Sequence, residues 1–206
     1  MSSFIESLET RRLLSGTAIV SGHTLVVRGT AEADAIIVGH SIDDPEIIVN
    51  FDNQTNVAVS DVGITKLKIV AGAGGDSIII DSVLALPAFV LGQGGNDTIE
   101  GGSKNDVILG GEGNDSISGN GGADSISGEA GKDTLLGGDG NDTLLGGAGN
   151  DRLSGGDGDD RVHGGANDDV LSGNAGTDRL IGSTGRDRFS VRDAAGEKKD
   201  KASNET

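Results

Sequence analysis

The chain has 206 residues, among them 37 glycines and no cysteine, tryptophan or tyrosine. Its 33 acidic residues exceed its 16 basic ones, and the formal net charge of −17 argues against a nucleic-acid or anionic-membrane surface. The absence of cysteine excludes disulfides and thiolate zinc sites. The four phenylalanines are the only aromatic residues besides histidine, so any core must be thin and aliphatic. No apolar stretch approaches the roughly 18 residues of a membrane-spanning helix.

The N-terminal segment, residues 1–22, contains FIESLETRRLLS at 4–15. It lacks the apolar run of a secretory signal. The stretch resembles a short Leu-Glu-x-Arg-x-Leu-Leu motif found near the start of some bacterial cell-surface proteins, which implies a surface or export segment. The alternative is a short helix capped by Ser3 or Ser7.

Residues 23–91 predict a β-rich N-terminal cap. LVVRGTAEADAIIV at 25–38 aligns with LKIVAGAGGDSIII at 67–80 at an offset of 42 residues, and both indicate strand, glycine turn, aspartate and strand. Between them, EIIVNF (46–51) and TNVAVS (55–60) flank a polar turn and predict a hairpin. Because an open sheet edge invites aggregation, we expect this region to cover the N-terminal end of the repeats that follow.

A repeat region of eleven nine-residue units runs without insertion from Gly92 to Ser190. Position one is always glycine, position six always aspartate and position eight always apolar, whereas position four is glycine except at Lys104 and Asn167. One further unit, AGAGGDSII at 71–79, lies upstream and has Asp76 at its sixth position. The sixth-position aspartates of the repeat region are Asp97, Asp106, Asp115, Asp124, Asp133, Asp142, Asp151, Asp160, Asp169, Asp178 and Asp187.

Each unit predicts a glycine turn followed by a very short strand. A glycine at position four adopts positive φ without a Cβ clash. The last three residues place one inward apolar side chain between two outward ones, the period of a strand. A strand that buries one side chain cannot fold alone, so the units must stack. Two units then make one coil of 18 residues, and the predicted fold class is all-β: a right-handed parallel β-roll with two short strands per coil.

Stacking arranges the aspartates in two columns, one along each edge of the roll. One column holds Asp97, Asp115, Asp133, Asp151, Asp169 and Asp187, and the other holds Asp106, Asp124, Asp142, Asp160 and Asp178. Like charges in a column repel, and turn carbonyls without ladder partners need partners of their own. A hard divalent cation between turns meets both needs. Ca²⁺ accepts about 6–8 carboxylate and carbonyl oxygens in flexible geometry, whereas Mg²⁺ keeps its waters.

The repeated phrase, GGDGNDTLLGGAGNDRLS at 137–154, resembles the RTX, or haemolysin-type, calcium-binding nonapeptide. The resemblance covers 92–190 and the unit at 71–79. It implies a parallel β-roll that binds multiple Ca²⁺ ions, with six turn residues and three strand residues per unit. It also implies the metal ligands, namely the carboxylates of Asp76 and of the eleven aspartates above, with main-chain carbonyls around the turn glycines. Those glycines are Gly92, Gly95, Gly110, Gly113, Gly119, Gly122, Gly128, Gly131, Gly137, Gly140, Gly146, Gly149, Gly155, Gly158, Gly173 and Gly176.

Three positions depart from the pattern. Lys104 places a Cβ and a positive charge where glycine is expected, so the cation site between the Asp106 and Asp124 turns should be weak or missing. Asn167 is a milder change, because asparagine tolerates left-handed geometry. Asp34 is interpreted as a turn residue rather than a ligand, because its turn lacks the glycines.

The sequence offers little to support an enzyme. It contains neither HExxH nor GxSxG, and His23, His40 and His163 are far apart, so we expect no catalytic residues and no organic cofactor. Regular aspartate columns are better explained by metal than by a glycosidase pair. Position three carries no threonine column, which argues against an ice-binding surface. A disordered glycine-rich segment is the state that we expect for 92–190 without cation.

These patterns predict a secreted or cell-surface structural or adhesive module that folds on binding calcium outside the cell. The alternative is a non-catalytic accessory or export domain of a larger RTX enzyme or toxin. The expected partners are calcium ions and a cell-surface or matrix component, with no nucleic acid. The predicted division is an N-terminal segment (1–22), a cap (23–91), the β-roll (92–190) and a polar C-terminal tail (191–206).

Overall fold

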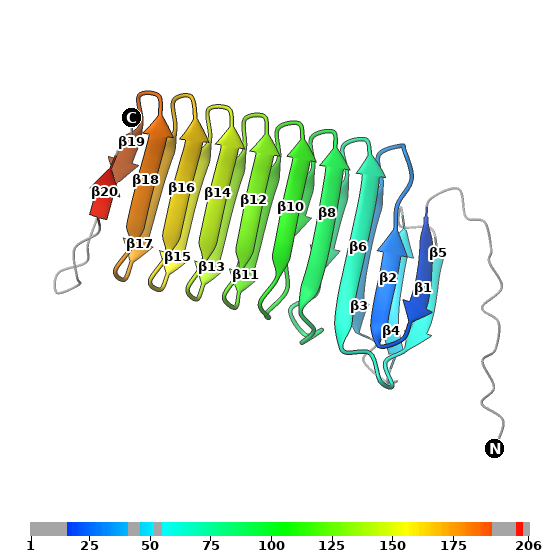
Figure 1. Cartoon of the computed structure of the whole chain (residues 1–206). Coiled ribbons are helices and arrows are strands. Elements are labelled where there is room, and N and C mark those ends of the chain that lie inside the picture. Colours follow the sequence, from blue (N-terminus) through cyan, green and yellow to red (C-terminus); the bar gives the residue numbers. More distant parts are fainter. Residues whose placement is uncertain (1–15, 41–45, 52–54, 191–200, 204–206) are drawn as a thin grey trace, which may run out of the picture.

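All regular structure in the described part of the chain is β (Figure 1). The computed structural model describes residues 16–40, 46–51, 55–190 and 201–203. Among these residues there is no helix, and therefore none long and apolar enough to cross a membrane. The described strands form two sheets of ten strands each.

The two sheets face each other along the whole molecule. Sheet 1 contains, in spatial order, β1 (Thr17–Ser21), β2 (Thr24–Arg28), β6 (Lys66–Ala73), β8 (Ala88–Gly94), β10 (Val107–Glu112), β12 (Ser125–Ala130), β14 (Thr143–Ala148), β16 (Arg161–Ala166), β18 (Arg179–Thr184) and β20 (Lys201–Ser203). Sheet 2 contains β5 (Thr55–Ser60), β4 (Glu46–Phe51), β3 (Ala35–His40), β7 (Ser77–Ile80), β9 (Thr98–Glu100), β11 (Ser116–Gly121), β13 (Thr134–Asp139), β15 (Arg152–Asp157), β17 (Val170–Ala175) and β19 (Arg188–Ser190).

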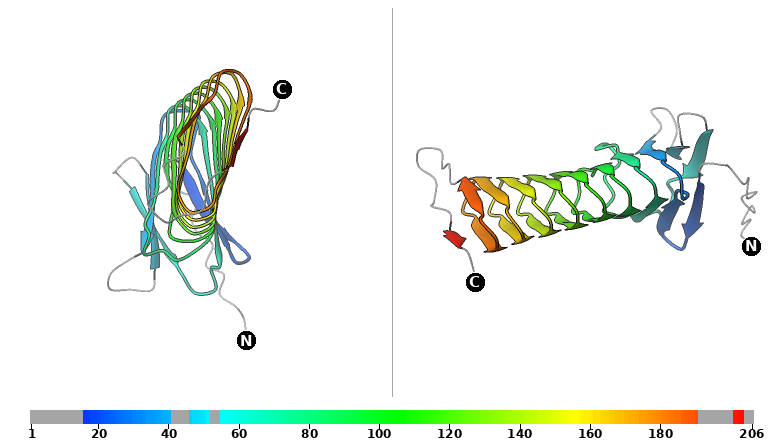
Figure 2. Two further views of the ribbon diagram at one scale, coloured as in Figure 1. Left: turned by 90° about the vertical axis from the view of Figure 1, so that its left-hand side faces the viewer. Right: turned by 90° about the horizontal axis from the view of Figure 1, so that it is seen from above.

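The chain winds between the sheets as a parallel β-roll, as predicted. Within the repeat region each strand pairs in parallel with the strand one coil later, so Ile108 lies opposite Ile126 and Ile117 opposite Leu135. Both offsets are 18 residues, which confirms two nonapeptides per coil. Viewed along its axis the roll is a narrow flattened tube (Figure 2). The stack also continues upstream of the repeats, because β8 pairs with both β6 and β10.

Antiparallel strands occupy the N-terminal end of both sheets. Strand β1 pairs with β2, and β4 pairs with β3 and β5. The predicted hairpin of 46–51 and 55–60 is therefore confirmed, and its turn at 52–54 lies outside the described residues, as does FIESLETRRLLS at 4–15. The alignment at an offset of 42 residues is the observed register, with Leu25 opposite Leu67.

Most strands of the repeat region are six residues long, so the expectation of three was wrong. Strand β11 runs from the seventh position of one unit to the third position of the next. The ladder skips position one and resumes beyond it, where Asn120 pairs with Gly138. Asn120 has φ 69°, and this left-handed residue allows the chain to bend while staying paired. Glycine-rich positions one to three carry no strand signal in the sequence.

The core is a single ladder of aliphatic side chains in the repeat region and a double ladder upstream. The eighth-position residues from Ile99 to Leu180 are 0–2% exposed. In contrast, β2 buries both Leu25 and Val27. At the other end Phe189 is partly buried against the core. Each unit therefore gains only one fully buried apolar side chain, worth about 1.5–3 kcal/mol.

Two further ladders of hydrogen bonds, one along each edge of the roll, join the fifth-position residues on the outside of the turns. The sequence pattern did not predict them. The side-chain oxygen of Asn114 accepts a hydrogen bond from the N–H of Lys132 at 2.8 Å, and Asn105 accepts one from Ala123 at 2.9 Å. Lys132 and Ala123 have no side-chain acceptor of their own, so both ladders are interrupted at these residues. The ladder replaces solvent contacts of exposed N–H groups by protein contacts, with a small gain for each bond.

Replacing Ala123 by asparagine should complete one ladder, because its amide oxygen would face the N–H of Asn141. We expect the free energy of unfolding in saturating calcium to rise by about 0.5–1.5 kcal/mol, measured by chemical denaturation. Asn114→Ala should lower it by a similar amount. Ala148→Asn, an exposed third-position control, should leave it unchanged. An equal gain from both asparagine substitutions would contradict the ladder.

Candidate metal centre

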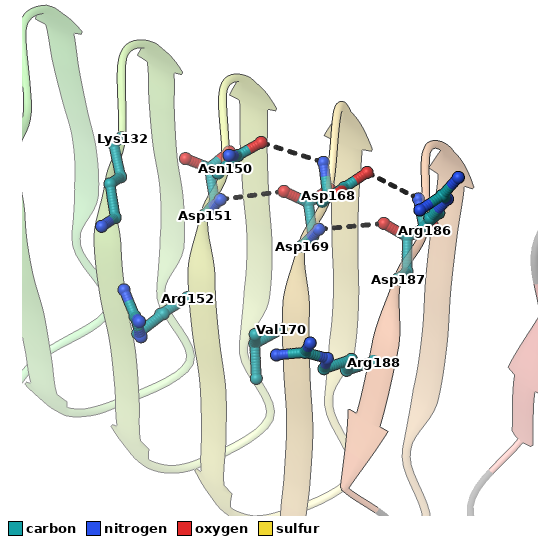
Figure 3. Close-up of a pocket in the computed structure, with 10 residues that line it drawn as sticks. All are labelled: Lys132, Asn150, Asp151, Arg152, Asp168, Asp169, Val170, Arg186, Asp187 and Arg188. Carbon is teal, nitrogen blue, oxygen red and sulfur yellow. Dashed lines mark hydrogen bonds between the residues drawn. The ribbon is translucent and has the colours of Figure 1, made fainter.

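The sixth-position aspartates form two continuous buried columns, as predicted. From Asp76 to Asp178 their side chains are 0–3% exposed, and Asp187 is partly buried. Each Oδ1 accepts a hydrogen bond of 2.7–3.0 Å from a main-chain N–H one coil earlier. The first column runs through Asp34, Asp76, Asp97, Asp115, Asp133, Asp151, Asp169 and Asp187, and the second through Asp106, Asp124, Asp142, Asp160 and Asp178 (two rungs of the first appear in Figure 3).

The second oxygen of most of these carboxylates has no hydrogen-bond donor among the described residues. These buried Oδ2 atoms belong to Asp97, Asp115, Asp124, Asp133, Asp142, Asp151, Asp160, Asp169 and Asp187. An ionised carboxylate oxygen buried without a donor is costly unless a proton or a cation compensates it. In nearly every turn, the buried Oδ2 atom therefore requires a proton or a cation beside it.

Position one is glycine because the carboxylate occupies the space in front of it. A Cβ at Gly110 would collide with Oδ2 of Asp115 and would lie 3.0 Å from the carbonyl oxygen of Gly128. Gly119 stands in the same relation to Asp124 and Gly137. The orphaned carboxylate oxygen and a main-chain oxygen of the next coil thus both approach the first-position glycine. The sequence shows that position one is always glycine, but not that a carboxylate faces it.

Position four adds further main-chain oxygens to the turn. Gly113 has φ +129°, and a Cβ on it would collide with the carbonyl oxygen of Gly95 in the previous coil. Gly131 has φ +138° and meets Gly113 in the same way. No hydrogen bond within the described part of the chain ends on these fourth-position carbonyls. The turns therefore contain many oxygen atoms and few hydrogen-bond donors.

The described residues contain no cluster of three or more His, Cys, Asp or Glu side chains that could hold a metal by themselves. Successive carboxylates in a column are separated by about one strand spacing, roughly 4.8 Å. A cation in a turn must therefore combine carboxylate with main-chain oxygens. This all-oxygen donor set in a flexible turn fits Ca²⁺ better than Mg²⁺, which demands near-octahedral geometry.

The turn that carries Lys104 is built differently. Neither Lys104 nor Gly102 has positive φ, and the N–H of Gly102 donates to Oδ2 of Asp106 at 2.8 Å. The main chain thus supplies the donor that the other turns lack. The weak or missing cation site between the Asp106 and Asp124 turns stays a prediction. Asp34 is satisfied in a comparable way, because its Oδ2 accepts hydrogen bonds from the N–H and the hydroxyl of Thr30.

Burial raises the pKa of the column carboxyls. Loss of hydration is the largest cause, the accepted main-chain N–H opposes it, and repulsion from neighbouring carboxylates adds to it in most turns. The pKa rises to about 7 for Asp124 and Asp160, and to about 6 for Asp115, Asp133, Asp151 and Asp169. It is also raised for Asp97, Asp106 and Asp142.

Comparison with known families identifies the repeat. Residues 91–126, 118–153, 127–162 and 154–189 match four copies of the RTX calcium-binding nonapeptide repeat. Residues 91–189 are an RTX array. RTX repeats bind calcium, their β-roll is a structural rather than a catalytic fold, and the proteins that carry them are typically secreted. The comparison with curated proteins finds no match.

Acidification should promote folding of the RTX array in calcium-free buffer. The folded-state pKa values lie above the ordinary aspartate value of 3.8, so protonation stabilises the fold. This contribution is complete below about pH 4 and is lost as pH rises through the folded-state values. We expect the far-UV circular dichroism of metal-stripped protein to gain β signal as pH falls from above 7 to below 6. A spectrum that does not change over this range would contradict the prediction.

Proposed function

We propose that the chain is a secreted or cell-surface structural or adhesive module whose RTX array folds when it binds calcium. The observation that carries the proposal is the series of buried Oδ2 atoms without donors, one in nearly every turn. An orphaned charge in nearly every turn makes the metal-free fold unfavourable near neutral pH. The same oxygens become ligands when a cation is present.

The proposed ligands are the carboxylates of Asp76 and of the eleven sixth-position aspartates, with the carbonyls of the first- and fourth-position glycines. The geometry supports this set because first-position carbonyls and Oδ2 atoms approach the same glycines, and fourth-position carbonyls accept no hydrogen bond from described residues. A bound Ca²⁺ supplies the positive charge that two neighbouring carboxylates share. The turn glycines hold their carbonyls toward the neighbouring coil.

The link to folding follows from mass action. Each site that exists only in the folded state stabilises it by RT ln(1 + [L]/Kd). Extracellular calcium modules work at roughly 10⁻⁴–10⁻³ M. The array is then unfolded where calcium is scarce, inside the cell, and folded outside it. Several sites in one stack make the total effect large even when each site is weak.

The secreted or surface location is supported by the typical secretion of RTX proteins and by the N-terminal segment that resembles a surface-protein motif. A structural or adhesive role is supported by the non-catalytic nature of the β-roll. The second candidate, an accessory domain of a larger RTX enzyme or toxin, rests on the same repeats. Finding a binding partner on cells or matrix would favour the adhesive module over the accessory domain.

A calcium titration of the metal-stripped chain tests the proposal directly. We expect circular dichroism to report a transition to β structure near millimolar calcium, and none with magnesium. Asp124→Asn keeps the Oδ1 acceptor and removes the charge, and it should raise the midpoint calcium concentration about threefold to tenfold. Asp106→Asn is the matched control with a smaller shift, because Oδ2 of Asp106 already accepts the N–H of Gly102. A β spectrum that chelator leaves unchanged would refute calcium-driven folding.

Replacing Lys104 by glycine should restore a cation site that we expect to be weak or missing in the native turn. Glycine allows the positive φ of the other turns and removes a cation, so Asp106 would no longer need the N–H of Gly102. Equilibrium dialysis is expected to show about one additional bound calcium per chain relative to the native protein. Lys132→Gly, which removes a lysine from a fifth position, should leave the stoichiometry unchanged. If both variants bound the same additional calcium, the loss of the lysine charge alone would explain the effect, and the proposed role of the Lys104 turn would be wrong.

A further inference from the structure

A basic groove lies at the outer edge of sheet 2, toward the C-terminal end of the roll (Figure 3). Its volume is about 570 Å³, and it is lined by residues from β15, β17 and β19, from the turns before them and from the turn before β13. Four of the lining residues are cations: Lys132, Arg152, Arg186 and Arg188. All four are exposed. They are gathered on one side of a chain whose net charge is −17.

No carboxylate among the described residues forms an ion pair with these cations. The one ion pair in the described part of the chain joins His40 to Asp61, far from the groove. Within the part of the chain that the structure describes, none of the four basic residues has a carboxylate partner within salt-bridge distance. Three of the four are arginines, whose planar guanidinium binds carboxylates through two parallel hydrogen bonds. The groove therefore presents free binding capacity for anions.

The spacing of the cations follows the axis of the roll. Arg152, Val170 and Arg188 occupy one cross-strand ladder, so the two arginines are two strand spacings apart, roughly 9.6 Å. Lys132 and Arg186 lie in the fifth-position row three coils apart, roughly 14 Å. Figure 3 shows the two arginines on either side of Val170. A ligand that meets all four must be linear and carry negative charges at intervals along its length.

The acidic residues of the groove indicate a ligand that also has hydroxyl groups. Asp151, Asp169 and Asp187 direct their carboxylates into the roll, where Oδ1 of Asp169 and of Asp187 accepts a main-chain N–H. Asp168 is the exposed acid, and its Oδ1 accepts the N–H of Arg186 at 2.9 Å. Its second oxygen is an acceptor placed among cations. Hydroxyl donors between the anionic groups of a ligand would satisfy it.

We propose that this groove binds a linear acidic polysaccharide whose sugar carboxylates engage Lys132, Arg152, Arg186 and Arg188. The ring hydroxyls donate to Asp168, and Val170 provides an apolar floor between the arginines. A single-stranded nucleic acid fits less well, because no aromatic residue lines the groove to stack on bases. The groove exists only in the folded roll, so the inference rests on the proposed function. It assigns the adhesive module a chemical class of target.

The test uses the full chain in saturating calcium, with its fold checked by circular dichroism in each sample. The probe is a short oligomannuronate, measured by isothermal titration calorimetry against a neutral mannan oligosaccharide and single-stranded oligothymidylate. We expect binding of the acidic oligosaccharide only, weakened by salt. Arg152→Gln/Arg188→Gln should weaken it at least about tenfold. The control, Arg161→Gln/Arg179→Gln, removes two exposed, adjacent arginines from the same unit position on sheet 1 and should change affinity little.

Each other outcome overturns the proposal. Equal binding of oligothymidylate would show a general polyanion surface, and equal losses in both double variants would remove the groove as the site. No binding by a protein whose spectrum is folded would exclude the ligand class. Failure of the proposed function is separate, because it appears as a spectrum that does not respond to calcium, whereas binding is scored on folded protein only.

Discussion

The roll depends on one hydrogen bond repeated along both of its edges, from a main-chain N–H to the buried carboxylate of the next coil. That bond uses one oxygen of each aspartate and leaves the other without a donor in most turns. A buried carboxylate is stable only when a proton or a cation compensates its charge. The interaction that aligns the coils therefore also makes their stability conditional on what the solution supplies.

The composition of the chain follows from this arrangement. Because the carboxylate fills the inner space of the turn, the facing residue must be glycine, as at Gly110 opposite Asp115. Because successive turns lie in contact, the fourth residue must also be glycine, as at Gly113 over Gly95. Only the eighth position is left for the core, so one aliphatic residue per unit replaces the large aromatic side chains of a layered domain. The turn with Lys104 shows the alternative, in which the main chain turns inward to bind Asp106 itself.

The strand pairing and the aspartate columns could be predicted from the sequence because two nine-residue units make one coil. That arithmetic gives the pairing of Ile108 with Ile126 and both aspartate columns. The remaining features depend on geometry that no period encodes. Asn120 extends its strand by adopting positive φ, and asparagine at position five does not reveal that its oxygen reaches the next turn. The groove was missed because Arg152 and Arg188 are 36 positions apart and meet only through their ladder with Val170.

The two ends of the roll are built differently, and this determines the end at which the number of ordered coils can change. At the N-terminal end, antiparallel strands and a double row of buried residues such as Leu25 and Val27 provide a fixed base. Beyond it, every coil rests on an equivalent neighbour through one inward side chain per strand. Removing the outermost coil exposes another of the same kind. The ordered part of the roll can therefore lengthen or shorten by whole coils at its C-terminal end, while the N-terminal base stays the same.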